Sequence, residues 1–314
     1  MKKIAFLFPG QGSQVSGMGK DLYEKYDAAK KVFETADKVL GFKISEICFN
    51  GTDEELKMTK NSQPAILATS LACLEALKSE IDIVPVATAG HSLGEYGALY
   101  TAGVLDMGDA IAITGKRAEL MNDAANATNG SMAAVIGLTP DEILEGLKEL
   151  QNEGVISVAN YNSPAQTVIT GEKELIEKSV DILKAKGAKR VIPLAVSGAF
   201  HSELMASASE KFADFVKDYN FKNAEIPVYE NVDGMPITDG EELKKRVPTQ
   251  IRSSVHWTET INGMINEGIT TFVELGAGKV LAGLNKKINA EVKTYNVYDV
   301  ASLEETVNEL KQGE

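Results

Sequence analysis

Cysteine and long apolar runs are both scarce in this chain of 314 residues. Its two cysteines, Cys48 and Cys73, form no CxxC or Cys/His cluster, which excludes a zinc-finger site and a disulfide framework. No apolar stretch approaches the ~20 residues of a membrane helix. The first of them, Ile4–Phe8, is also shorter than the roughly 7–15 residues of a secretory signal core. We therefore expect a cytoplasmic protein with no membrane segment and no metal.

Positive charge is in deficit as well. Lysine and arginine number 32 against 45 aspartates and glutamates, which gives a net charge of −13. Such a surface repels phosphate backbones and anionic lipids, so binding to nucleic acid or to a membrane is not expected. Hydrophobic residues make up 44% of the chain, enough for one large domain or for one that carries a smaller one.

Short apolar segments alternate with amphipathic ones, a pattern typical of an α/β fold whose largely parallel sheet is covered on both faces. Strands are expected over residues 4–8 and 81–89, with an amphipathic helix over 22–40 between them. A second helix is expected to be capped by Asn61-Ser62. Further strands are expected near Val228 and over residues 271–275 and 292–297.

The order of expected strands and helices changes in the stretch from Ser131 to Pro193. The pattern indicates strands and helices in the order βαββαβ, with strands over 132–136, 155–160, 167–170 and 189–193 and helices over 140–150 and 172–186. This order is that of the ferredoxin-like split unit. We predict that residues 128–196 form a small ferredoxin-like domain inserted into a larger α/β core made of residues 1–127 and 197–314.

The sharpest motif is a G-x-S-x-G pattern, Gly90-His-Ser-Leu-Gly94, placed between an expected strand and an expected helix. Glycines allow the tight turn that lifts a serine clear of its neighbours at a strand tip. Partial positive charge at the helix N-terminus favours a developing oxyanion there. We predict that Ser92 is a nucleophile and that the backbone N–H of Leu93 is the first oxyanion donor.

A serine nucleophile needs a base, and the chain offers only three histidines. His91 adjoins Ser92 and is expected to be structural, whereas His256, beside Trp257, is typical of a packed or capping histidine. His201 stands in a loop that opens a helix, where catalytic residues are common, and is the preferred base. The aspartates between Ser92 and His201 fit caps or solvated faces better than a triad acid, so a backbone carbonyl is an alternative that would orient the histidine.

A glycine-rich loop, Pro9-Gly-Gln-Gly-Ser-Gln14, directly follows the first strand. It fits neither phosphate-binding pattern: Val15 stands where G-x-G-x-x-G needs its third glycine, and Met18 stands where a P-loop needs lysine. A loop at a strand tip that donates a backbone N–H is the better interpretation.

Arg117 is one of four arginines and falls on an expected helix about 25 residues after the serine. Spacing alone favours an ordinary surface arginine. If its side chain faces inward, the buried guanidinium needs a partner, and a substrate carboxylate could supply a bidentate one.

Taken together and in this order, the motifs resemble the malonyl-CoA:acyl carrier protein transacylases of type II fatty acid synthesis. The resemblance runs from residue 3 to about 290 and rests on these segments: Pro9–Gln14, Gly17-Met-Gly19, Gln63-Pro64, Gly90–Gly94, Arg117, Asn162-Ser-Pro164, Gly198-Ala-Phe-His201 and Gly276-Ala-Gly-Lys279. It implies a hydrolase-like parallel-sheet core with an inserted ferredoxin-like domain.

The resemblance also implies roles for individual residues. Ser92 would be the nucleophile and His201 the general base and acid, with the backbone N–H groups of Gln11 and Leu93 forming the oxyanion hole. Arg117 would bind the malonyl carboxylate, which reverses the interpretation from spacing. The main-chain carbonyl of Gln250 would orient His201, and the pocket lining implied is Gln63, Met121, Asn162 and Phe200.

The implied reaction is a ping-pong transfer from malonyl-CoA through malonyl-Ser92 to the phosphopantetheine thiol of acyl carrier protein, with no permanently bound cofactor. A serine esterase or thioesterase shares the G-x-S-x-G turn but predicts a triad carboxylate and gives Arg117 no special use. A malonyl-loading acyltransferase that serves a polyketide synthase is a second alternative. A module that only holds an acyl carrier is disfavoured because Ser92 and His201 are both present.

Overall fold

A computed structural model describes residues 3–196 and 198–312. Its larger sheet has the strand order β10-β9-β1-β2-β7-β8, in which all neighbours are parallel except β7 and β8. The strands are β1 (Ile4–Phe8), β2 (Ala87–Gly90), β7 (Val228–Tyr229), β8 (Pro236–Ile237), β9 (Thr271–Leu275) and β10 (Lys293–Val297).

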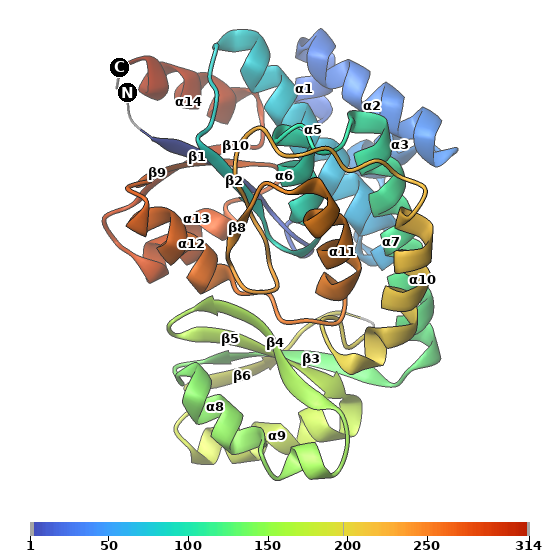
Figure 1. Ribbon diagram of the computed structural model, residues 1–314, viewed down its shortest axis with the longest axis vertical. Helices are drawn as coiled ribbons and strands as arrows, with labels where there is room; N and C mark the ends of the chain where they lie inside the picture. The colour runs from blue at the N-terminus through green and yellow to red at the C-terminus, as the bar shows by residue number, and fades with distance from the viewer. Residues whose placement is uncertain (1–2, 197, 313–314) are drawn as a thin grey trace.

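Helices cover both faces of this sheet (Figure 1). They are α1 (Lys20–Lys25), α2 (Asp27–Leu40), α3 (Ile44–Asn50), α4 (Asp53–Lys57), α5 (Thr59–Glu80), α6 (Glu95–Thr101), α7 (Met107–Ala127), α10 (Ala206–Val216), α11 (Gly240–Gln250), α12 (Trp257–Asn266), α13 (Val280–Ile288) and α14 (Val300–Gln312). Alternate residues of β1 belong to different cores. Phe6 and Phe8 pack in the cluster with α2, α5 and α7, while Ala5 and Leu7 pack in the one with α12 and α13. A parallel strand buried on both faces explains the continuous apolar run at 4–8.

The second sheet is antiparallel, with the order β4-β5-β3-β6, and lies apart from the parallel sheet (Figure 1). The strands of this sheet and the two helices that accompany it are, in chain order, β3 (Gly130–Ile136), α8 (Pro140–Leu147), β4 (Ile156–Ser163), β5 (Gln166–Glu172), α9 (Lys173–Ala185) and β6 (Arg190–Pro193). One face packs on α8 and α9 through residues such as Val135 and Ile169. Met132 and Val168, on the other face, join the main core. The βαββαβ order predicted from the sequence is thus present.

Hydrogen bonds connect β4 to the segment after α11. Val255 N donates to Ala159 O at 2.8 Å, and Tyr161 N donates to Val255 O at 2.9 Å. Ser254 Oγ donates to Val158 O at 2.7 Å. The residues that follow Gln250 are therefore bound to the antiparallel sheet, although α11 covers the parallel one.

Three local details of the larger core differ from the predictions. Tyr26 has extended backbone angles, so the helix expected over 22–40 is two helices, α1 and α2. Helix α5 begins at Thr59 rather than at Asn61-Ser62, with Met58 at its N-cap position. Of the apolar run at 81–89, only residues 87–89 lie in a strand, β2, which ends at Gly90; Val84 is 76% exposed and lies outside the sheet.

We propose that the domain bounds lie at 127/128 and 196/197, since the antiparallel sheet is formed entirely between Gly130 and Pro193. Ser197, at the second of these bounds, lies outside the described residues. Among residues 3–196 and 198–312, no helix is long and apolar enough to cross a membrane.

Candidate active site

Ser92 lies at the tip of β2, in a short 3-10 turn (Ser92–Gly94) that leads into α6. Its φ of 53° is in the left-handed region, which L-residues rarely adopt. Both glycines of the motif are required by close packing. A Cβ on Gly90 would lie 1.9 Å from the Gly94 carbonyl carbon, and one on Gly94 would lie 2.2 Å from the Phe8 oxygen. The turn is thus pressed against the end of β1, and the serine projects from it.

His201 lies across from Ser92, with its Nε2 2.9 Å from Ser92 Oγ. Its Nδ1 faces two backbone carbonyls, of Gln250 at 2.9 Å and of Ser253 at 3.0 Å. A carbonyl can only accept, so Nδ1 carries the proton and Nε2 keeps its lone pair for the serine hydroxyl. His201 also has a left-handed φ, 58°, and with Ser92 it makes up the non-glycine residues of positive φ in the described chain. Strain of this kind collects at functional sites.

Arg117 reaches the same point from α7 and is fully buried. Its Nη1 donates to Gln63 Oε1 at 2.6 Å, and its Nη2 donates to Gln250 Oε1 at 2.7 Å and to Ser92 Oγ at 3.1 Å. All three acceptors are uncharged, and its Nε has no partner among the described residues. A buried guanidinium bonded only to neutral oxygens favours the arrival of a carboxylate.

Burial, followed by the positive charge of Arg117, lowers the pKa of His201 to about 3. The imidazole is therefore neutral, and able to accept a proton, throughout the physiological range. The native state binds fewer protons at His201 than the unfolded chain does between pH 6.5 and pH 3. The contribution of this residue to stability is accordingly complete above pH 6.5 and is lost as the pH falls through that window.

The low pKa of His201 predicts how the rate of the acylation expected at Ser92 depends on pH. Between pH 8 and pH 5.5 the single-turnover rate is expected to change by less than about threefold, because His201 stays neutral. A histidine of ordinary pKa would lose about tenfold over this range. Quenched-flow mass spectrometry of the acyl-enzyme measures the rate, with circular dichroism to verify the fold at each pH. A midpoint near pH 6.5 would show that the active site does not hold the imidazole neutral.

A narrow cavity of about 80 Å³ opens onto Ser92 and His201. Its wall includes four residues of the predicted site: Gln11, Gln63, Met121 and Phe200. Asn162 is not on this wall, and Asn160 from the same strand takes the place expected for it. Asn162 lies behind, its Oδ1 2.8 Å from Nε2 of His91, which packs against Trp257.

The two predicted oxyanion donors come from the ends of adjacent strands. Gln11 follows β1 and Leu93 follows β2, which pair in register up to Phe8 and Gly90. Leu93 is buried in the first turn after the strand, where backbone N–H groups have no partner within the helix. Their function as donors stays a prediction. Within residues 3–196 and 198–312, no group of three or more metal-binding side chains gathers.

Two features of the site were missed by the sequence reasoning. The side chain of Gln250 contacts both Arg117 and Ser92, with its Nε2 donating to Ser92 O at 2.9 Å. Asn231 donates to Gly90 O and accepts from Ser92 N, both at 2.7 Å. The available signal was position: Asn231 comes just after the strand near Val228, and carboxyl ends of parallel strands share one edge of a sheet.

A strand-tip serine paired with a neutral histidine on a parallel α/β sheet is typical of enzymes that transfer or hydrolyse acyl groups. The chain belongs to the acyl transferase family, whose acyl transferase domain matches residues 5–307. A curated relative from Bacillus subtilis, named malonyl CoA-acyl carrier protein transacylase, is 47% identical over 99% of this chain and 98% of its own. A Staphylococcus aureus protein of the same name is 43% identical, over 95% and 96%.

Solved structures agree with this assignment. An acyl carrier protein S-malonyltransferase from Vibrio cholerae superposes with a TM-score of 0.93 at 40% identity, covering 97% of this chain and 100% of that one. A malonyl transacylase solved in complex with the holo form of its type II polyketide synthase acyl carrier protein gives 0.95 at 38% identity, covering 98% and 100%.

Proposed function

We propose that this protein transfers the malonyl group from malonyl-CoA to the phosphopantetheine thiol of acyl carrier protein, through an ester on Ser92. The single observation that carries the proposal is the buried Arg117, whose guanidinium contacts the nucleophile oxygen and lacks a charged acceptor. A malonyl thioester brings a carboxylate to that position together with the carbonyl that Ser92 attacks. The names of the relatives point to the same substrates.

In the first half-reaction, Ser92 Oγ attacks the thioester carbon and its proton passes to His201 Nε2. The oxyanion is held by the N–H groups of Gln11 and Leu93. Collapse breaks the carbon–sulfur bond, and His201 returns the proton to the departing sulfur of CoA. Malonyl-Ser92 remains, with its carboxylate on Arg117.

In the second half-reaction, the thiol of the carrier gives its proton to His201 and attacks the ester carbon. The carbon–oxygen bond breaks, and Ser92 Oγ recovers the proton from His201. The chemistry uses only side chains and backbone groups of this chain, with malonyl-CoA as substrate and no permanently bound cofactor. Supply of malonyl units to fatty acid synthesis, at a cytoplasmic location, is part of the proposal.

The environment of His201 favours transfer over a hydrolase of the triad type. A triad would place a carboxylate on Nδ1, whereas the acceptors there are the carbonyls of Gln250 and Ser253. The complex of a relative with a polyketide synthase carrier favours a second possibility, in which the cognate carrier serves polyketide synthesis. Rates with the two kinds of carrier would separate these.

Intact mass spectrometry after brief exposure to malonyl-CoA tests the proposal directly. We expect one malonyl adduct, located on Ser92 by peptide mapping, that persists for minutes in buffer and disappears when holo acyl carrier protein is added. The apo carrier, which lacks the thiol, is the matched control and is expected to leave the adduct in place. Rapid loss of the adduct to water would instead indicate a hydrolase.

A further inference from the structure

Asn231 holds the backbone on both sides of His91. Its Oδ1 accepts the Ser92 N–H and its Nδ2 donates to the Gly90 carbonyl, each at 2.7 Å. The residue is fully buried. One side-chain amide therefore spans the turn that presents the nucleophile.

The Ser92 backbone needs such support because its φ of 53° is unfavourable for a residue with a Cβ. Gln250 supplies the other half, its Nε2 donating to the Ser92 carbonyl at 2.9 Å. Both polar groups of the Ser92 backbone are thus bound by side-chain amides from other elements. The Ser92 N–H is occupied by Asn231 and is unavailable to an oxyanion. The backbone N–H of Leu93 is therefore the predicted oxyanion donor of this turn.

Asn231 is itself anchored by its main chain. Its N–H donates to Glu95 Oε2 at 2.9 Å, and its carbonyl accepts from His256 N at 2.9 Å. The preceding residue, Glu230, is fully buried and pairs with Arg246 of α11 at 3.2 Å.

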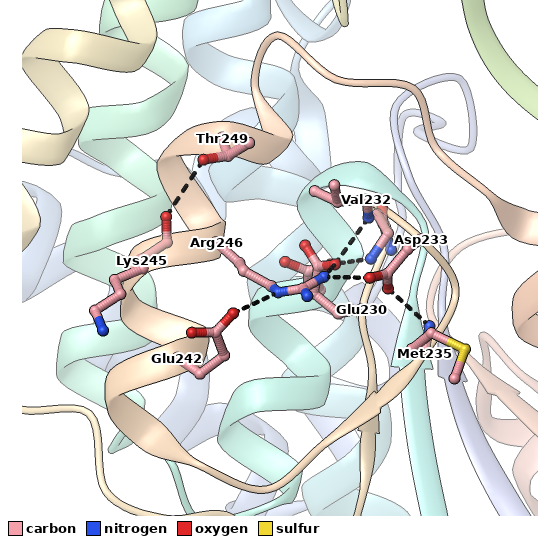
Figure 2. A network of polar contacts seen from close by, with 10 residues as sticks. Glu230, Val232, Asp233, Met235, Glu242, Lys245, Arg246 and Thr249 are labelled. Atoms are coloured by element: carbon pink, nitrogen blue, oxygen red, sulfur yellow. Dashed lines mark hydrogen bonds and ion pairs between the residues drawn. The ribbon is translucent and has the colours of Figure 1, made fainter.

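Arg246 contacts three carboxylates at once (Figure 2). Besides Glu230, its Nη1 lies 2.6 Å from Asp233 and its Nε 3.0 Å from Glu242. Glu230 and Asp233 flank Asn231 in the chain, so this guanidinium fixes the segment Glu230–Asp233 to α11. One helical turn further on, α11 presents Gln250.

We propose that Asn231 is a positioning residue for the nucleophile and that Arg246, through Glu230, sets its place relative to Gln250. The two amides that hold the Ser92 backbone are then fixed to one another by a single ionic junction outside the cavity. Arg246 touches neither Ser92 nor His201 and acts only through these neighbours. The inference rests on the proposed role of Ser92 as nucleophile.

Four variants test it: Asn231→Ala, Arg246→Met, Arg246→Lys and the matched control Lys245→Met. Lys245 is exposed on the same helix, next to Arg246, so its replacement removes the same charge without the junction. Each variant is measured for single-turnover acylation by malonyl-CoA, for KM, for thermal unfolding and for labelling by a small fluorophosphonate. That probe has no carboxylate for Arg117 to bind and needs no carrier, so it reports the reactivity of Ser92 toward a substrate other than malonyl.

Asn231→Ala is expected to lower both acylation and fluorophosphonate labelling about 10- to 100-fold, since small misplacements of a reacting group have effects of this size. Arg246→Met is expected to lower both about 3- to 10-fold, with KM for malonyl-CoA changed by less than about threefold. Arg246→Lys should recover part of the loss because it keeps the charge, and Lys245→Met should match the parent.

Should Asn231→Ala fail to fold, the Arg246 variants decide the matter. If Arg246→Met lowers the melting temperature while its folded protein labels at the parental rate, the residue is only structural and the inference is wrong. Parental rates in a folded Asn231→Ala would overturn it as well. Failure of the parent itself to react at Ser92 would contradict the proposed function instead.

Discussion

Arg117→Ala is expected to reduce the preference for malonyl over acetyl thioesters about a hundredfold. The fully buried guanidinium is bonded only to neutral oxygens, so a malonyl carboxylate gives it the charged partner that it lacks. Loss of one partner from a buried, hydrogen-bonded ion pair typically removes 2–5 kcal/mol, and about 2.7 kcal/mol corresponds to a hundredfold. An acetyl thioester has no carboxylate for Arg117 to bind, so its acylation rate falls less in this variant.

The ratio of the two acylation rates is the appropriate measurement, because Arg117 also donates to Ser92 Oγ and its removal slows every substrate. The ratio for Arg117→Lys is expected to lie between those of the parent and Arg117→Ala, since lysine keeps the charge and loses the bidentate geometry. Lys116→Ala, one residue away on α7 and paired with Glu119, is the control and should leave the ratio unchanged. An unchanged ratio in Arg117→Ala would remove the carboxylate from the proposed contacts of this residue.

Ser92→Ala is expected to abolish the malonyl adduct, and His201→Ala to slow its formation by roughly a thousandfold or more. The serine supplies the bond-forming atom and the histidine removes its proton across 2.9 Å, so neither works without the other. For the same reason, the double variant should transfer malonyl no more slowly than Ser92→Ala alone.

Transfer of radiolabelled malonyl to acyl carrier protein measures the residual rates, and circular dichroism verifies that the variants fold. Additive losses in the double variant would indicate that Ser92 and His201 act in separate steps. An adduct that persists in Ser92→Ala would move the nucleophile to another residue and would overturn the proposed mechanism.

The parts of the structure that could be predicted from the sequence are those encoded locally. Continuous apolar segments located β1 and β9, and their alternation with amphipathic segments predicted the order of the βαββαβ unit. The Ser92 turn was predictable because close packing excludes any side chain at Gly90 and Gly94. Scarcity of histidine was enough to nominate His201.

Long-range contacts were not predictable in this way. Spacing placed Arg117 on a helix but favoured the surface, since burial of a guanidinium is unfavourable until its partners are known. Those partners, Gln63 and Gln250, are 54 and 133 residues away. Asn231 belongs to no recognisable motif and reaches Ser92 only because β7 pairs with β2. The helical spacing of apolar residues continues through Tyr26, so it did not predict the break there.

The groups that hold the proposed nucleophile and the proposed base come from different parts of the fold. Ser92 stands at the tip of β2 of the parallel sheet. Of the two carbonyls that orient His201, that of Gln250 is at the end of α11, whereas that of Ser253 is next to Ser254 and Val255, which are hydrogen-bonded to β4. The 2.9 Å distance from Ser92 Oγ to His201 Nε2 therefore depends on how the two sheets are placed relative to each other. If the antiparallel sheet only covered the cavity, shortening it would have little effect on the orientation of His201. We instead expect the antiparallel sheet to help orient the proposed base, because its edge strand β4 is hydrogen-bonded to the segment next to the Ser253 carbonyl.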